Sequence, residues 1–172
     1  MNFDRPKTKI LCMDVDGTLT NGKIYISASG ECMKAFDVKD GYGIARLLPE
    51  KGIVPVIITG RKSAIVEKRA AELGIREIYQ GVEDKCEVLE ELIRKYACQY
   101  AEAAYIGDDI PDLACMKMCG IKGCPQDAVS EVKEICDYIC ERKAGAGAVR
   151  EFIDWLVNDN EQSGKTGNFV LL

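Results

Sequence analysis

The sequence predicts an α/β fold, in which a doubly wound parallel sheet is covered by helices on both faces. Short apolar runs of strand length alternate with segments of helix length, the order that β-α-β crossovers produce. Several of the apolar runs end in Asp, Gly or Thr, as strands do where they enter a loop. At 172 residues, 47% of them hydrophobic, the chain is long enough to bury its core as one domain.

Six apolar runs are expected to form the sheet. The first is continuous over residues 10–13, which fits a strand buried on both faces. The second ends in Val-Ile-Ile before Thr59, and the fourth ends in Ala-Tyr-Ile before Gly107. The expected strands span residues 9–16, 54–59, 77–80, 103–108, 120–123 and 138–140.

Helices are expected between these strands because capping residues mark their ends. Ser63 can cap a helix that Gly74 stops, and Asp84 can cap the next one. Pro111 fits the first turn of a helix that Gly120 ends. The expected helices span residues 64–73, 86–98, 111–119, 128–136 and 148–157, with one more before the second strand.

One segment departs from the alternation of strands and helices. Two short β runs within residues 23–36 flank the turn from Ser27 to Gly30, so a hairpin is expected that stands over the end of the first strand. The gaps on either side of Thr59 leave no room for a separate cap domain. We expect one domain over residues 1–157 and a mobile tail over residues 158–172.

Charge and composition exclude several classes of function. The net charge is −5 and no block of Lys and Arg occurs, so no nucleic acid or anionic membrane partner is expected. The polar N-terminus and the lack of long apolar runs favour a cytoplasmic protein. Histidine is absent, so any chemistry must depend on carboxylates, Lys, Tyr, Cys or a bound ion.

The nine cysteines are expected to be reduced and to act as small hydrophobic residues. Their number is odd, the chain is long, and no C-x-x-C motif occurs. The alternative is a structural zinc site formed by four of them, Cys115, Cys119, Cys124 and Cys136.

The most informative motif is Asp14-Val15-Asp16-Gly17-Thr18, which follows the first predicted strand. Ligands bind at the carboxyl edge of open α/β sheets, and residues two apart point to one side, so Asp14 and Asp16 can face one site. Two close carboxylates repel each other unless a cation or a shared proton is present. An ordinary strand-to-loop turn explains the same residues equally well.

Three further strand ends supply groups that suit a phosphate and a divalent cation. Thr59, Gly60 and Arg61 place a hydroxyl, an N–H group and a guanidinium at the start of a helix. Lys85 begins another helix. The fourth strand is followed by three acidic residues, Asp108, Asp109 and Asp112. Each group alone has a structural explanation, but their joint placement at one sheet edge favours a catalytic site.

With these four motifs the sequence resembles the haloacid dehalogenase superfamily of aspartyl-phosphate phosphatases. The resemblance implies that Asp14 is the nucleophile and Asp16 the general acid/base. It also implies that Thr59, Gly60 and Lys85 bind the phosphoryl group, and that Lys85 holds Asp14. The motifs match, in family order, at Asp14-Val15-Asp16-Gly17-Thr18, Thr59-Gly60, Lys85 and Gly107-Asp108-Asp109-x-x-Asp112.

The same resemblance implies a Mg²⁺ site. Asp108 is expected to bind the ion together with Asp14 and the backbone carbonyl of Asp16, with Asp109 and Asp112 as outer supports. Oxygen ligands of this kind suit magnesium better than zinc. We expect Asp16 to lie among acidic neighbours.

Finer similarity is to the capless, tetrameric phosphatases of 3-deoxy-D-manno-octulosonate 8-phosphate, which act in lipopolysaccharide biosynthesis. It implies a homo-oligomer, with the hairpin at the subunit contact, and Arg61 binding the carboxylate of a sugar acid. Arg69 and Arg150 are weaker candidates for substrate contacts. Two alternatives remain, a phosphatase of sialic-type nine-carbon sugar 9-phosphates or of sugar phosphates in general, and a phospho-aspartate signalling receiver.

Overall fold

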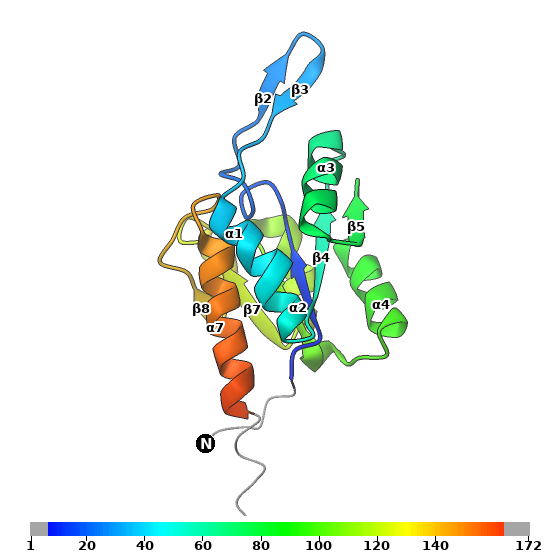
Figure 1. Ribbon diagram of the computed structural model, residues 1–172, viewed down its shortest axis with the longest axis vertical. Coiled ribbons are helices and arrows are strands. Elements are labelled where there is room, and N and C mark those ends of the chain that lie inside the picture. Colours follow the sequence, from blue (N-terminus) through cyan, green and yellow to red (C-terminus); the bar gives the residue numbers. More distant parts are fainter. Residues whose placement is uncertain (1–6, 164–172) are drawn as a thin grey trace, which may run out of the picture.

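The computed structural model describes residues 7–163, and its centre is one parallel sheet of six strands (Figure 1). The strand order is β5-β4-β1-β6-β7-β8. The predicted doubly wound fold is confirmed, with each predicted strand present. The strands are β1 (Ile10–Met13), β4 (Val54–Thr59), β5 (Glu77–Gln80), β6 (Ala103–Ile106), β7 (Ile121–Cys124) and β8 (Tyr138–Ile139).

The strand order creates a switch point beside β1. After β1 the chain adds β4 and β5 on one side, and then crosses over to add β6, β7 and β8 on the other. Met13 is level with Ile57 of β4 and with Ile106 of β6. The loops after β1, β4 and β6 therefore leave the sheet at the same edge, where open α/β sheets bind ligands.

Helices cover both faces of the sheet. A continuous helical segment contains α1 (Val38–Tyr42), a π-helical turn (Gly43–Leu47) and α2 (Leu48–Glu50). The π-helical turn ends two residues before Pro49, which has no N–H to donate. The others are α3 (Ala64–Leu73), α4 (Lys85–Lys95), α5 (Leu113–Met118), α6 (Ser130–Lys133) and α7 (Ala148–Ser163), with 3₁₀ turns at Tyr100–Glu102 and Ile110–Asp112.

Two apolar cores result from this arrangement. One holds Ile44, Val66 and Phe152 from the α1–α2 segment, α3 and α7. The other holds Leu89 and Met116, from α4 and α5, and lies against the opposite face of the sheet. None of the described helices is both long and apolar enough to cross a membrane.

The predicted capping residues are confirmed. The Ser63 hydroxyl accepts from the Val66 N–H, and the Asp84 carboxylate accepts from the Cys86 N–H at 2.8 Å. Gly74 ends α3 in the left-handed conformation, with φ of 71°.

The predicted hairpin is present, and its base lies over the end of β1, where Lys34 donates to Asp16. Its strands are β2 (Tyr25–Ser27) and β3 (Gly30–Met33), and Figure 1 shows them projecting away from the body of the molecule. Ile26 is 72% exposed and Met33 is 52% exposed. Within residues 7–163 the insertions between strands are this hairpin and single helical segments, so no cap domain is present there.

Several predicted boundaries were wrong. The helix expected over residues 128–136 shrinks to Ser130–Lys133, and the one expected to end at residue 98 ends at Lys95. The last helix continues to Ser163 because no Gly or Pro follows Val157 until Gly164. The first part of the predicted tail is therefore helical, and residues 164–172 lie outside the described part of the chain.

Candidate active site

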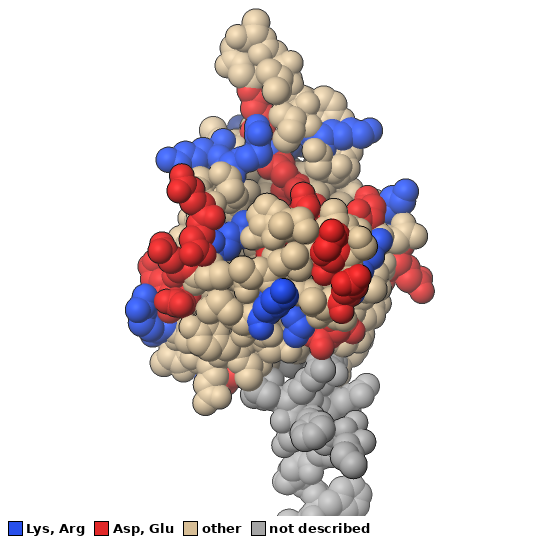
Figure 2. Space-filling view, turned by 180° about the vertical axis from the view of Figure 1, so that it is seen from behind, with Lys and Arg blue, Asp and Glu red and all other residues tan. Residues whose placement is uncertain are grey.

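The residues predicted for catalysis, phosphate binding and metal binding line one cleft at the carboxyl edge of the sheet. Its volume is about 170 Å³, far above the roughly 10 to 15 Å³ that one water molecule needs on the same measure. Figure 2 shows acidic and basic side chains gathered below the projecting hairpin. The cleft is lined by Asp14, Asp16, Thr59, Gly60, Arg61, Val82, Glu83, Lys85, Asp108, Asp109, Pro111 and Asp112.

Lys85 joins two carboxylates from different strand ends. Its ammonium group donates to Asp14 Oδ1 at 2.6 Å and to Asp112 Oδ1 at 2.7 Å. The Lys85 side chain is only 6% exposed. Although burial alone lowers the pKa of Lys85, the charges of Asp14 and Asp112 outweigh it and raise that pKa. Lys85 is therefore cationic, and it holds Asp14 as the sequence implied.

Asp14 and Asp108 are difficult to ionise together in this cleft. Burial raises the pKa of Asp14 to about 7, the charge of Asp112 adds to the effect, and Lys85 opposes it. Burial also raises the pKa of Asp108 to about 7, against a hydrogen bond that Thr18 donates at 2.8 Å. A cation between the two carboxylates would favour the ionised form of both and so lower both pKa values.

The carboxylate oxygens form a group that fits a divalent cation. Asp14, Asp108 and Asp112 each offer one oxygen, and these three oxygens lie within 4.8 Å of one another. Lys85 and Thr18 occupy one oxygen each of Asp14 and Asp108. A set of oxygen ligands that a lysine only partly neutralises is the kind that Mg²⁺ prefers. Whether the Asp16 carbonyl completes it stays a prediction.

Asp112 organises the cleft more than its predicted outer position suggested. Its Oδ1 accepts from Lys85 and, at 2.8 Å, from the Tyr105 hydroxyl, while its Oδ2 accepts from the Asp108 N–H at 3.1 Å. One carboxylate thus orients both Lys85 and the Asp108 loop. Asp109 is exposed, and its side chain caps the following 3₁₀ turn by accepting from the Ile110 N–H at 2.7 Å.

Asp16 shares the cleft with Asp14, Asp108 and other acidic residues, as expected, but its direct ion-pair partners are cationic, which was not predicted. Lys34, from the base of the hairpin, donates to Asp16 Oδ1, and the Arg61 Nε lies 3.7 Å from Oδ2. The Lys34 side chain is only 1% exposed. Glu31 of β3 joins this network, 2.9 Å from Lys34 and 3.7 Å from Arg61. Chain folding, and not sequence proximity, determines which charges surround Asp16.

The second motif lines the cleft from the end of β4, the strand next to β1. Thr59 ends β4 and is buried, and its carbonyl accepts from the Val82 N–H at 3.2 Å. Gly60 is exposed beside it, and the Arg61 side chain is 49% exposed. Its ion pairs with Asp16 and Glu31 are both long, at 3.7 Å. An exposed guanidinium with long ion pairs can turn towards a ligand.

Sequence reasoning missed three side chains that shape the site. Thr18 belongs to the first motif, and its buried hydroxyl could have been suspected from that position. Lys34 and Tyr105 carried no signal, because one lies in a hairpin and the other inside a buried strand. Only the three-dimensional fold brings them to Asp16 and Asp112.

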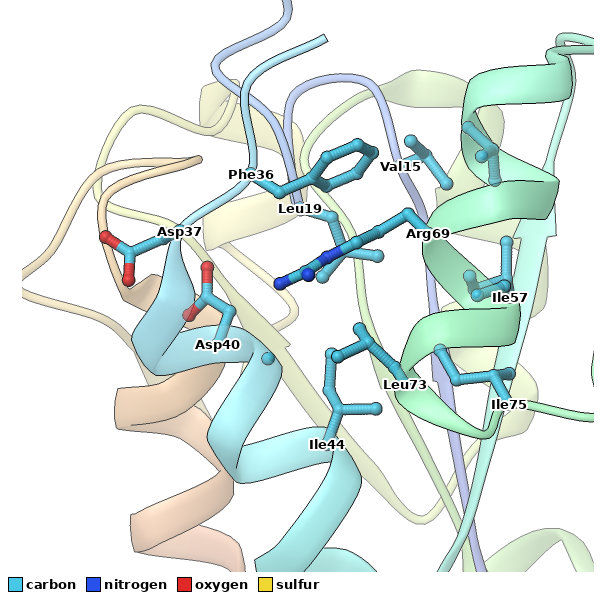
Figure 3. Close-up of a pocket in the computed structure, with 13 residues that line it drawn as sticks. Val15, Leu19, Phe36, Asp37, Asp40, Ile44, Ile57, Arg69, Leu73 and Ile75 are labelled. Carbon is cyan, nitrogen blue, oxygen red and sulfur yellow. The ribbon is translucent and has the colours of Figure 1, made fainter.

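Arg69 and Arg150 do not line the cleft. Figure 3 shows Arg69 in a second pocket, beneath the hairpin, where its guanidinium extends between Phe36 and Asp40. Its guanidinium carbon lies 5.7 Å from the centre of the Phe36 ring. Arg150 is paired with Asp154 at 2.8 Å. Asp154 lies on the same helix as Arg150, and the Arg150 guanidinium carbon lies 5.2 Å from the centre of the Tyr42 ring of α1. Both arginines therefore pack against side chains outside the cleft, which supports a structural role.

The alternative zinc site is not supported. All nine cysteines are free thiols. In the described part of the chain, the carboxylate group of Asp14, Asp108 and Asp112 is the one cluster with spacing that suits a metal, so Cys115, Cys119, Cys124 and Cys136 do not form one.

Comparison with known proteins agrees with this geometry. The profile of the haloacid dehalogenase-like hydrolases matches residues 71–153. The 3-deoxy-D-manno-octulosonate 8-phosphate phosphatase of Yersinia pestis is 41% identical over 160 residues, which cover 92% of this chain and 85% of the relative. The corresponding phosphatase of Escherichia coli K12 is 42% identical over 149 residues, covering 87% of this chain and 79% of the relative.

Solved structures show the same similarity. The 3-deoxy-D-manno-octulosonate 8-phosphate phosphatase from Moraxella catarrhalis, in complex with magnesium, phosphate and the sugar acid, superposes with a TM-score of 0.85 and 39% identity. The match covers 92% of this chain and 91% of that one. A cobalt-bound phosphatase of the same kind from Haemophilus influenzae gives a TM-score of 0.87 at 32% identity, covering 96% of each chain.

Proposed function

Because this chain belongs to the haloacid dehalogenase-like hydrolase family, which includes the 3-deoxy-D-manno-octulosonate 8-phosphate phosphatases, we propose that it hydrolyses 3-deoxy-D-manno-octulosonate 8-phosphate to the free sugar acid and phosphate. The observation that carries the proposal is the meeting of Asp14, Asp108 and Lys85, from three strand ends, in one cleft. Similarity to whole phosphatases over most of their length supports the choice of substrate.

Asp14 is the proposed nucleophile. Its carboxylate attacks the phosphorus atom, the bond to the sugar oxygen breaks, and the phosphoryl group remains on Asp14 until water removes it. Lys85, fixed by Asp112, offsets negative charge beside the attacking oxygen. Asp14 and Asp108 would hold Mg²⁺, which when bound would supply the charge neutralisation that lets an anionic nucleophile approach an anionic phosphate. We propose that Thr59 and the Gly60 N–H, which line the same cleft, bind phosphoryl oxygens.

Asp16 is the proposed general acid and base. It would give a proton to the departing sugar oxygen and then take one from the water that attacks phospho-Asp14. The Lys34 contact fixes the orientation of this carboxyl, and the half-exposed Arg61 lies 3.7 Å from its other oxygen. We propose that Arg61 binds the carboxylate of the sugar acid, for which its planar guanidinium is suited.

Phosphate release tests this function directly. The protein should release phosphate from 3-deoxy-D-manno-octulosonate 8-phosphate with Mg²⁺ present and lose activity with a chelator. It should act more slowly on a sialic-type nine-carbon 9-phosphate and on simple hexose phosphates. Asp14→Asn should abolish turnover and leave the circular dichroism spectrum unchanged. A variant with substantial residual turnover, or a wild-type protein that is merely phosphorylated, would contradict the proposal.

We also propose that the protein is a cytoplasmic homo-oligomer, a tetramer, with the hairpin at the subunit contact. The hairpin exposes Ile26 and Met33, and its projecting tip carries no charged side chain between Tyr25 and Gly30. Exposed strand edges and apolar side chains of this kind favour burial by another subunit. Light scattering should give a mass several times that of one chain, and Ile26→Glu should reduce it. A monomeric wild-type protein would refute this part.

A further inference from the structure

One carboxylate of the hairpin is held beside the cleft, although the strand that carries it is mostly exposed. Glu31 belongs to β3, whose other three residues are exposed, yet the Glu31 side chain is only 16% exposed. The hydroxyl of Ser63, the residue that caps α3, donates to Glu31 Oε2. The ammonium group of Lys34 lies 2.9 Å from Glu31 Oε1. The hairpin therefore brings an acidic and a basic side chain to the same place.

Glu31 also faces Arg61 of the second motif. The Arg61 Nη2 lies 3.7 Å from Glu31 Oε1, and the Arg61 Nε lies 3.7 Å from Asp16 Oδ2. Both distances exceed hydrogen-bonding range, so neither carboxylate uses the N–H groups of the guanidinium. Although burial alone raises the pKa of Glu31, the Ser63 hydrogen bond and the charges of Lys34 and Arg61 outweigh it and lower that pKa. Glu31 is therefore an anion at neutral pH.

Glu31 offers Arg61 the same chemical group as the sugar acid that Arg61 is proposed to bind. A guanidinium binds a carboxylate most strongly through two parallel N–H···O bonds. Glu31, tied to Ser63 and 3.7 Å away, does not form them, whereas a ligand in the cleft can adjust its position to do so. The negative charge of Glu31 opposes the approach of a second carboxylate to the same guanidinium. The two carboxylates therefore compete for Arg61.

We propose that Glu31 is a positioning residue for Arg61, which it keeps beside the cleft between turnovers and for which it competes with the carboxylate of the sugar acid. This inference rests on the proposed function, because it takes the sugar acid as the ligand of Arg61. When the product leaves, Glu31 pairs with Arg61 again. The competition weakens the binding of the free sugar acid and so favours its release.

Binding measurements on the full-length protein test the proposal. Dissociation constants for 3-deoxy-D-manno-octulosonate and for inorganic phosphate are measured separately by titration calorimetry with Mg²⁺ present. Glu31→Gln keeps an acceptor for Ser63 but removes the charge, so it should bind the sugar acid about two- to fivefold more tightly than wild type. Its affinity for phosphate should stay as in wild type.

Glu72→Gln is the matched control. It removes another Glu–Arg pair, in which Arg69 lies 3.3 Å from Glu72 on α3, and neither residue lines the cleft. It should bind both ligands as wild type does. Arg61→Gln should bind the sugar acid more weakly, and adding Glu31→Gln to it should give a much smaller gain than in wild type, because the two side chains act on the ligand together.

The sign of the change distinguishes competition from a structural role. If Glu31 only fastened the hairpin, its removal would loosen the site and weaken binding. The inference is overturned by sugar acid binding that is absent, unchanged or weaker in Glu31→Gln, by an equal gain for phosphate, or by the full gain without Arg61. Should Glu31→Gln fail to fold, Glu31→Asp retains the charge on a shorter side chain, and it should give a smaller gain in the same direction.

Phosphate release tests the proposed function separately. A wild-type protein that hydrolyses the sugar acid phosphate, together with a Glu31→Gln variant that binds the sugar acid no more tightly, would refute the competition and leave the phosphatase function intact. A wild-type protein without hydrolysis would refute the proposed function itself.

Discussion

Adding one methyl group at Gly17 should displace Asp108 from its place beside Asp14 while the sheet stays intact. Gly17 has φ of 102°, and a Cβ atom built there would lie 2.0 Å from Asp108 Oδ2. Cβ contacts below 3.0 Å are essentially never found. The Asp108 carboxylate would therefore have to move by about 1 Å, against the hydrogen bond from Thr18.

The magnitude follows from that displacement. A misplacement of about 1 Å at a reacting centre costs roughly 100-fold in rate, which is about 2.7 kcal/mol of activation free energy. Gly30 is the matched control, because its φ of 111° is similar and a Cβ atom there would meet nothing within 4 Å. Both Gly→Ala variants should lose about 1 to 3 kcal/mol of stability through backbone strain, but only Gly17→Ala should lose turnover.

Phosphate release as a function of Mg²⁺ concentration measures the loss of turnover, and urea unfolding measures the loss of stability. Gly17→Ala should show a kcat about 100-fold lower and a weaker response to Mg²⁺, whereas Gly30→Ala should keep wild-type kcat at the same oligomeric state. If both variants retain the wild-type rate, or if both lose it equally, the close approach of Gly17 to Asp108 does not determine catalysis.

Three further variants test other parts of the structure. Lys34→Met removes the buried partner of Asp16, so kcat should fall at least about tenfold with a smaller change in KM; an unchanged kcat would contradict the positioning role. Although burial alone raises the pKa of Glu77, hydrogen bonds led by Lys95 outweigh it and lower that pKa. Glu77→Gln should therefore lose about 1 kcal/mol of stability at pH 7, and the difference should shrink as the pH falls below about 4.5, as urea midpoints at several pH values would show. Burial raises the pKa of Asp40 to about 6, so its ionised form is disfavoured in the folded protein, and the stability it contributes at low pH is lost as the pH rises through about 6. Asp40→Asn should therefore gain roughly 1 to 2 kcal/mol relative to wild type at pH 7 and show no gain at pH 4; thermal melting at both values checks the sign.

Much of the fold could be predicted because its signals are local. Residues 10–13 and 54–59 are apolar enough to be strands by themselves, and Ser63 and Gly74 mark helix ends through their own backbone preferences. The short length of α6 was not predictable in the same way, because its ends depend on packing. The extension of α7 to Ser163 could have been predicted from the lack of Gly or Pro before Gly164, but it was missed.

The residues of the candidate site also divide into those with a local sequence signal and those without one. Asp14, Lys85 and Asp108 were found because each follows a strand and the carboxyl ends of parallel strands meet. Lys34 could not be found, because a hairpin lysine is exposed in most proteins and becomes a buried partner only when the hairpin base packs on the cleft. Tyr105 is similar, since its hydroxyl reaches Asp112 from inside a strand.

Asp14 and Asp16 leave the same strand end, but the elements that neutralise them differ. Asp14 is paired with Lys85, which the sheet body holds through Asp112, so its geometry is independent of the hairpin. Asp16 is paired with Lys34 of the hairpin base, so its environment changes whenever that hairpin moves or a neighbouring subunit fixes it. Two carboxylates with different surroundings can take different roles in one reaction. The proposed phosphoryl transfer therefore depends on the rigid sheet, and the proposed proton transfer depends on the position of the hairpin.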